Sequence, residues 1–164
     1  MDDESPTVPE RFAVAVLMER RRGVTPWQAH AWVPVGLIAG AVAEGAVGVP
    51  LAMPADGDVL RELWRGLDVR LHRDEVESYY HNLVSPTPLA FVIMREGAAD
   101  HRVPAIVTLC FDEANAYVEG DDQVESVPMP PELVQWLEHF VVDNYVPERR
   151  TRRERKAWTD PKTP

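Results

Sequence analysis

The sequence has almost no cysteine and no long apolar run. The single cysteine, Cys110, excludes an internal disulfide bond and any metal site built from cysteines alone. No apolar stretch reaches the roughly 20 residues that span a bilayer, so we expect no membrane contact. The acidic start, Met1–Glu4, has the opposite charge to the start of a secretory signal. Together these features predict a cytoplasmic protein.

The patterns that mark catalytic and cofactor sites are also missing. The five histidines form no His-x-x-x-His pair, and there is no glycine-rich phosphate loop. A mixed site of His72, His81 and nearby glutamates is a weaker interpretation than surface histidines beside a helix. Asp74-Glu75 and Asp112-Glu113 suit general acid–base chemistry, but helix capping explains both pairs. We therefore predict no metal, no cofactor and no catalytic residue.

Cys110 itself is predicted to be a buried structural residue. It follows an apolar run and precedes Asp112 and Glu113. Acidic neighbours raise the pKa of a thiol, whereas a nucleophilic cysteine needs a lowered pKa. This environment disfavours a reactive cysteine of the kind used in sulfur transfer.

Length and charge indicate one domain with charged ends. A chain of 164 residues, 45% hydrophobic and 27% charged, fits one folded domain. We expect a disordered acidic N-terminus (1–10), a single domain (11–147) and a basic, disordered tail (148–164). Seven basic and three acidic residues give the tail a net charge of +4. Because the whole chain carries −10, residues 1–147 carry −14. An acidic body makes nucleic-acid binding by the domain unlikely.

Hydrophobic periodicity predicts an α+β fold with a mostly antiparallel sheet, or a small open barrel, of about five strands. The predicted strands are residues 12–18, 27–38, 67–72, 89–94 and 105–111. The first two form a hairpin with Gly23 and Pro26 in its loop, and Pro34 indicates an edge strand or a bulge. Residues 39–53 are predicted to be irregular and partly packed. Residues 60–64 fit either a helix or a strand.

Two short helices after strands and a C-terminal amphipathic helix complete the prediction. Asp74 is the expected N-cap of the first, and the second runs from Asp112 to Gly120. The segments that lead into these helices, Leu71–Glu75 and Leu109–Glu113, both run from a strand through an Asp-Glu pair into a short helix. This similarity fits either a duplicated unit or common capping chemistry. The last helix, Pro131–Tyr145, should lay its apolar stripe across the sheet.

Two features are candidates for binding a partner. The tail carries a cluster of cations, namely Arg149, Arg150, Arg152, Arg153, Arg155 and Lys156. This cluster fits docking onto an acidic protein or a solvated chain end, and it lacks the interleaved aromatics of a nucleic-acid site. Trp136 on the last helix is either a core residue or an interface anchor.

Several stretches resemble an uncharacterised bacterial family, domain of unknown function 3305. They cover roughly residues 12–156 and comprise Val16–Arg21, Trp27, Trp32–Val35, Leu71–Tyr79, Asn82-Leu83, Pro88, Phe91–Arg95 and Glu125–Leu133. A basic segment after the last helix is also typical of the family. There it resembles a compact Lys-Arg-Lys-Arg block, whereas here it is arginine-rich and interrupted by Glu148 and Glu154.

Genes of this family often lie beside genes for molybdenum- or tungsten-containing formate dehydrogenases. The resemblance therefore implies a non-catalytic accessory or adaptor protein that helps to assemble or regulate such an enzyme, with an enzyme subunit or a companion accessory protein as its partner. One alternative is a small cofactor-handling protein that binds a molybdopterin nucleotide, which a deep pocket lined by several arginines would favour. A weaker alternative is a nucleic-acid-associated regulator.

Overall fold

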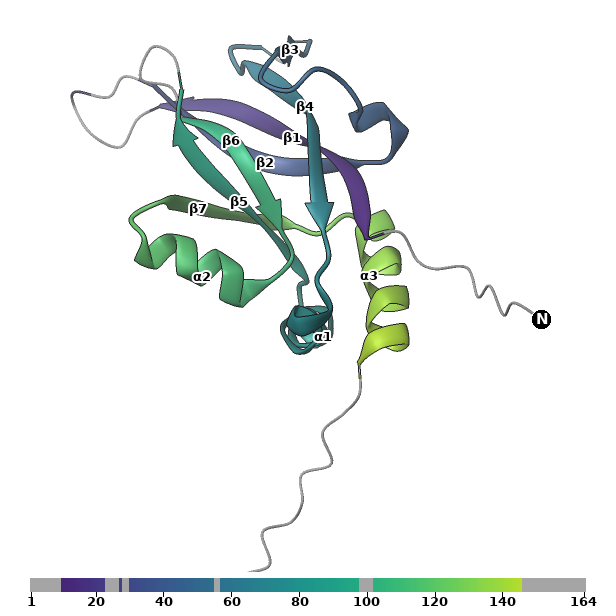
Figure 1. Cartoon of the computed structure of the whole chain (residues 1–164). Helices are drawn as coiled ribbons and strands as arrows, with labels where there is room; N and C mark the ends of the chain where they lie inside the picture. Colours follow the sequence, from purple (N-terminus) through teal and green to yellow (C-terminus); the bar gives the residue numbers. More distant parts are fainter. Residues whose placement is uncertain (1–9, 23–26, 28–29, 55–56, 98–101, 146–164) are drawn as a thin grey trace, which may run out of the picture.

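The computed structural model describes residues 10–22, 27, 30–54, 57–97 and 102–145. These residues form two antiparallel sheets of four and three strands, with the α-helices gathered around one end (Figure 1). The α+β class is therefore confirmed. Glu10, which we assigned to the N-terminal segment, already contacts the domain, because its carbonyl accepts a 2.9 Å hydrogen bond from the Leu71 N–H. The predicted basic tail lies outside the described residues.

The four-stranded sheet has the order β2-β1-β4-β3 and consists of β1 (Arg11–Arg22), β2 (His30–Ala39), β3 (Pro50–Ala52) and β4 (Arg61–Arg70). β1 and β2 pair as the predicted hairpin, and both strands differ in length from their apolar runs. The loop residues Gly23 and Pro26 lie outside the described part of the chain. Residues 39–53 are largely irregular, as predicted, and add only a 3₁₀ turn, η1 (Ala41–Ala43), and the short β3.

Pro34 lies both on an edge strand and at a bulge. β2 is the outer strand of its sheet, and its pairing with β1 shifts where Leu17 faces Gly36 and Met18 faces Pro34. Val35 is the extra residue on β2. Proline has no N–H for a ladder hydrogen bond, so an edge or a bulge is where a strand tolerates it.

A second bulge lies in β4, directly after the ambiguous segment 60–64. Trp64 and Leu67 are three residues apart on β4, whereas their partners on β1, Val16 and Val14, are two apart. β4 therefore contains one extra residue. The alternation therefore shifts, and Trp64 and Leu67 both pack against the main core. Segment 60–64 fits a helical face because the neighbours Leu63 and Trp64 are both apolar and both packed, Leu63 in a small second cluster and Trp64 against the main core. Residues 61–64 belong to β4, so the helical alternative is wrong.

The three-stranded sheet has the order β6-β5-β7, with β5 (Leu89–Glu96), β6 (Arg102–Thr108) and β7 (Gln123–Pro128). We did not predict β7, whose only aliphatic side chains are Val124 and Val127. The described residues thus contain seven strands in two open sheets, and the prediction of one sheet or barrel of about five strands is wrong. β4 lies beside β6 and β2 beside β7, so the two sheets face each other around the core.

The helices are α1 (Val76–Val84), preceded by the 3₁₀ turn η2 (Arg73–Glu75), α2 (Phe111–Glu119) and α3 (Pro131–Asn144). α2 contacts all three strands of the smaller sheet, while α1 and α3 pack together at the end of the two sheets (Figure 1). No side chain caps η2 or α1, so the prediction of Asp74 as an N-cap is wrong. No helix in the described part of the chain has the length and apolar character to cross a membrane.

The main core lies between the sheets and is closed by α3. The predicted stripe of α3 is confirmed, since Leu133, Trp136, Leu137, Phe140 and Val141 are buried. The Trp136 side chain is 6% exposed, and its ring centroid lies 5.2 Å from that of Phe12 on β1. Trp136 therefore lies in the core, which favours its structural role over that of an interface anchor.

Gly66 is expected to be essential to the bulge of β4. Its φ of +83° is strained for any residue with a Cβ, and a Cβ there would lie 2.6 Å from the carbonyl oxygen of Gly45. Gly66→Ala should lower the free energy of unfolding by about 1–2 kcal/mol from backbone strain alone, as measured by urea denaturation. Gly36→Ala is the matched control, because Gly36 has open space around it and an ordinary φ. Equal effects of the two substitutions would contradict this role for the bulge.

The burial of Trp136 leads to a second prediction. Trp136→Ala should destabilise the protein by about 3–5 kcal/mol, because it removes a large buried side chain that the core cannot refill. Val142→Ala on the same helix should change stability little, since Val142 is 80% exposed. If Trp136→Ala cost no more than Val142→Ala in thermal or urea unfolding, α3 would not close the core as described.

Candidate functional site

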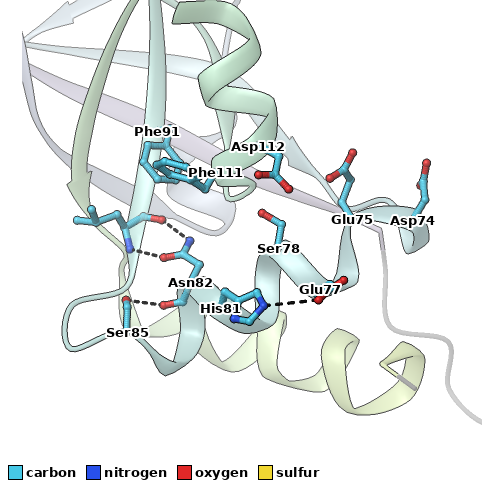
Figure 2. Close-up of a pocket in the computed structure, with 11 residues that line it drawn as sticks. Asp74, Glu75, Glu77, Ser78, His81, Asn82, Ser85, Phe91, Phe111 and Asp112 are labelled. Atoms are coloured by element: carbon cyan, nitrogen blue, oxygen red, sulfur yellow. Dashed lines mark hydrogen bonds and ion pairs between the residues drawn. The ribbon is translucent and has the colours of Figure 1, made fainter. Parts of the chain in front are cut away.

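An open cavity of about 600 Å³ lies between α1 and α2 (Figure 2). Its size falls within the roughly 300–1,000 Å³ of small-molecule and side-chain binding pockets. The lining residues are Asp74, Glu75, Glu77, Ser78, His81, Asn82, Ser85, Leu89, Phe91, Phe111 and Asp112. Four carboxylates against one imidazole make the cavity strongly acidic, and we call it the acidic pocket.

The acidic pocket brings Asp74 and Glu75 together with Asp112, which the sequence places far apart, whereas Glu113 does not line it. Asp74 and Glu75 end η2 before α1, and Asp112 lies in the first turn of α2. Each pair follows a strand and lies at the start of a helix, and the two helices contact each other. We interpreted these acids as helix caps, and their meeting in one cavity could not be read from sequence spacing.

The four carboxylates differ in what already binds them. Glu77 Oε1 lies 3.7 Å from His81 Nε2, and Glu75 Oε2 accepts a hydrogen bond of 3.0 Å from the Cys110 thiol. Asp74 and Asp112 are exposed, and neither side chain forms a hydrogen bond or ion pair with another described residue. These two carboxylates are free to bind a cation that enters the pocket.

One wall of the acidic pocket is aromatic. Phe91 on β5 is almost buried, and Phe111 at the start of α2 contacts it edge to face with ring centroids 6.0 Å apart. Phe111 is 59% exposed, which is unusual for so large an apolar side chain. We predicted Phe111 as the end of a strand, and the structure instead places it beside the carboxylates. An exposed ring next to free carboxylates suits a flat cation such as a guanidinium group.

Asn82 fixes α1 against the smaller sheet at the back of the pocket. Its side-chain amide donates to the carbonyl oxygens of Leu89 (2.8 Å) and Leu109 (2.9 Å) and accepts from the Leu89 N–H (2.9 Å). Leu89 and Leu109 lie just beyond the last pair of the β5–β6 ladder, Phe91 and Thr108. One side chain therefore satisfies backbone groups that the β5–β6 ladder leaves unpaired, and it also lines the pocket (Figure 2).

Cys110 joins α1 to α2 beneath the pocket. It is the N-cap of α2, and its sulfur accepts a 3.3 Å hydrogen bond from the Glu113 N–H. Its own N–H donates to Thr108 Oγ1 (3.1 Å), whose hydroxyl donates to Glu113 Oε2 (2.8 Å). This arrangement works as a capping box with cysteine in the usual place of serine. Helix α2 thus starts earlier than we predicted, with Cys110 rather than Asp112 at its boundary.

The Cys110 thiol is held in its protonated form. Burial is the largest cause, and together with the hydrogen bond to the Glu75 carboxylate it raises the pKa of the thiol to about 11, against the opposing hydrogen bond with Ser78. The side chain is fully buried, which confirms the predicted structural cysteine. A thiol with a raised pKa and no exposure is poorly suited to nucleophilic chemistry.

The other predicted site residues do not join this pocket. The tail cations, Arg149 to Lys156, lie outside the described residues, and Trp136 lies in the core. Among the residues that the structure describes, no group of three or more histidine, cysteine or acidic side chains is placed to hold a metal ion. The arrangement can bind a cation through free carboxylates and an aromatic wall.

Fold and pocket together define a small α+β protein with an acidic, aromatic-walled binding pocket. The model of the family described as Protein of unknown function (DUF3305) matches residues 13–155, and the chain belongs to this family. This match confirms the resemblance seen in the sequence, and it extends into the basic segment as far as Arg155. No curated protein and no solved structure matches the chain.

The raised thiol pKa predicts a loss of stability at alkaline pH. In the unfolded chain Cys110 ionises near its ordinary pKa of about 8.5, whereas the folded pKa is about 11. As the pH rises between these values the unfolded state loses its proton first, so the free energy of unfolding should fall.

Cys110→Ala should reduce this fall, which urea titrations under reducing conditions at several pH values between about 7 and 10 would measure. Burial also raises the pKa of Tyr79, with a smaller contribution from Cys110. The difference between the two proteins is therefore read below about pH 9, where an ordinary tyrosine with a pKa of about 10 keeps its proton in the unfolded chain. Parallel pH profiles would show that Cys110 is not held protonated.

Proposed function

We propose that this chain is an accessory protein without a catalytic centre of its own, and that it acts by binding another protein. The observation that carries the proposal is the acidic pocket, whose free carboxylates and exposed aromatic ring suit a partner's side chain. The chemistry of the pocket favours arginine. A guanidinium group can donate two hydrogen bonds to one carboxylate and stack its plane on a phenyl ring at the same time.

The pocket receives carboxylates from two directions. Glu77 projects from α1 and Asp112 from α2, so a cation between the helices would meet both (Figure 2). The body of the protein adds a long-range attraction, since residues 1–147 carry a net charge of −14. A basic segment of a partner would therefore be attracted before it docks, and added salt should weaken the association.

The particular partner is proposed from the family. The family resemblance implies a gene context beside molybdenum- or tungsten-containing formate dehydrogenases. We propose that the partner is a subunit of such an enzyme or a companion accessory protein, and that binding aids assembly or regulation. The tail cations Arg149, Arg150, Arg152, Arg153, Arg155 and Lys156 are proposed as a second contact, with an acidic surface of the partner.

The proposal is tested by complementation of a deletion strain. Loss of the gene should lower formate oxidation and the metal content of the enzyme, while the enzyme's message stays constant. The wild-type gene should restore both, and the variant Glu77→Gln with Asp112→Asn should not, because it removes two negative charges from the pocket without changing side-chain size.

Glu138→Gln is the matched control, because it changes an exposed acid of α3 outside the pocket. It should complement fully. Formate oxidation that is unchanged by the deletion would contradict the proposed role in the enzyme system. Full complementation by the pocket variant would instead contradict the role of the acidic pocket.

A further inference from the structure

The inner face of the four-stranded sheet changes from apolar to cationic at one end of β1. Along β1, Val14, Val16 and Met18 are buried in the main core, and Arg20 follows at the next position of the same face. A second cavity, of about 460 Å³, opens there against the start of β6. Its lining is cationic and aromatic, and consists of Arg20, His30, Trp32, Gly48, Pro50, Glu62, Trp64, Arg102 and Val103.

No described residue neutralises the two arginines of this cavity. Neither Arg20 nor Arg102 makes a side-chain hydrogen bond or ion pair with any other residue in the described ranges. The opposite face of the same strand behaves differently. There Glu19 binds both Arg21 (3.1 Å) and Arg61 (3.3 Å), and the hydrogen bond from Arg21 lowers the pKa of Glu19. Unpaired arginines at inward-facing positions are therefore a feature of the cavity and not of the strand.

Two indole rings flank these arginines. Trp32 pairs directly with Arg20 across the β1–β2 ladder, and Trp64 pairs with Pro50 of β3. Both tryptophans are partly buried against the edge of the main core, so their rings are held in place. Glu62 is the one carboxylate of the lining, and it can accept from an amino or hydroxyl group.

We infer that this cavity binds a phosphorylated planar heterocycle, the chemistry of a nucleotide. Arg20 and Arg102 supply charge-assisted donors for a phosphate, the indoles supply flat apolar surface for a ring, and the volume suits a small molecule. The site is separate from the acidic pocket, since the two cavities share no lining residue. It is cationic in an otherwise acidic body, which repels anions elsewhere.

Inward-pointing charges also have a structural use, because they keep strand edges from pairing with other chains. This use applies to Arg102, because β6 is an edge strand whereas β1 is paired on both sides. In that case Arg102 would need no ligand, and Arg102→Gln would promote self-association without changing any affinity. The two explanations therefore predict different measurements on the same variants.

The test titrates the purified full-length chain with AMP and GMP, with the matching nucleosides and with inorganic phosphate, following tryptophan fluorescence and calorimetry. Saturable binding of a nucleotide is expected, with each fragment at least about tenfold weaker, and added salt should reduce the affinity. Arg20→Gln and Arg102→Gln should each weaken nucleotide binding by about tenfold or more. Urea midpoints close to that of the wild type would show that the variants fold, and Arg102 is exposed enough to be replaced safely.

Two full-length controls separate this site from other cations. Arg21→Gln changes the neighbour of Arg20 on the opposite face, and Arg152→Gln with Arg153→Gln removes charge from the tail. Both should bind like the wild type. The inference is overturned if no nucleotide saturates the protein up to about 1 mM. It is also overturned if phosphate binds as tightly as the nucleotides, or if the tail variant loses binding while Arg20→Gln keeps it.

Discussion

The hydrogen bonds of the Asn82 amide link the parts of the molecule on which its chemistry depends. This side chain of α1 bonds to Leu89 and Leu109, at the open end of the β5–β6 ladder. Its position determines where α1 lies, and the Cys110 thiol then connects α1 to the N-terminus of α2 through Glu75. The acidic pocket is the space that these links leave between the two helices. The hydrogen bonds of Cys110 fix the starts of both helices, and this fixes the backbone positions from which the carboxylates of the pocket project.

Long, clear apolar patterns predict their elements well. Continuous apolar runs mark the β1–β2 hairpin and β5, and an apolar stripe of helical period marks α3. The failures have physical causes. Gly66 inserts a bulge that changes the period within β4, and β7 has only two aliphatic residues to signal a strand. Sheet number depends on which strands pair, and single-strand patterns carry no such information.

The acidic pocket was visible in the sequence only in part. The matching Asp-Glu pairs at residues 74–75 and 112–113 are visible in the sequence, and helix capping accounts for them by local chemistry alone. The meeting of Asp74 and Glu75 with Asp112 depends on long-range contacts between α1 and α2, which spacing along the chain does not encode. The likeness of the two strand–helix starts was the available signal. The sequence signal for the cavity lined by Arg20 and Arg102 is weaker. Arg20 is recognised as part of the inner face of β1 only when the strand is known to extend to Arg22.

The central claim is that the pocket between α1 and α2 binds arginine of a protein partner. The most direct measurement is a titration of the ¹⁵N-labelled full-length chain with a short peptide that carries two arginines, followed by amide chemical shifts. The account predicts saturable shifts concentrated on residues of η2, α1 and the start of α2, with a lysine peptide binding more weakly because it lacks the planar fork. Shifts confined to other surfaces, or equal responses to both peptides, would contradict it.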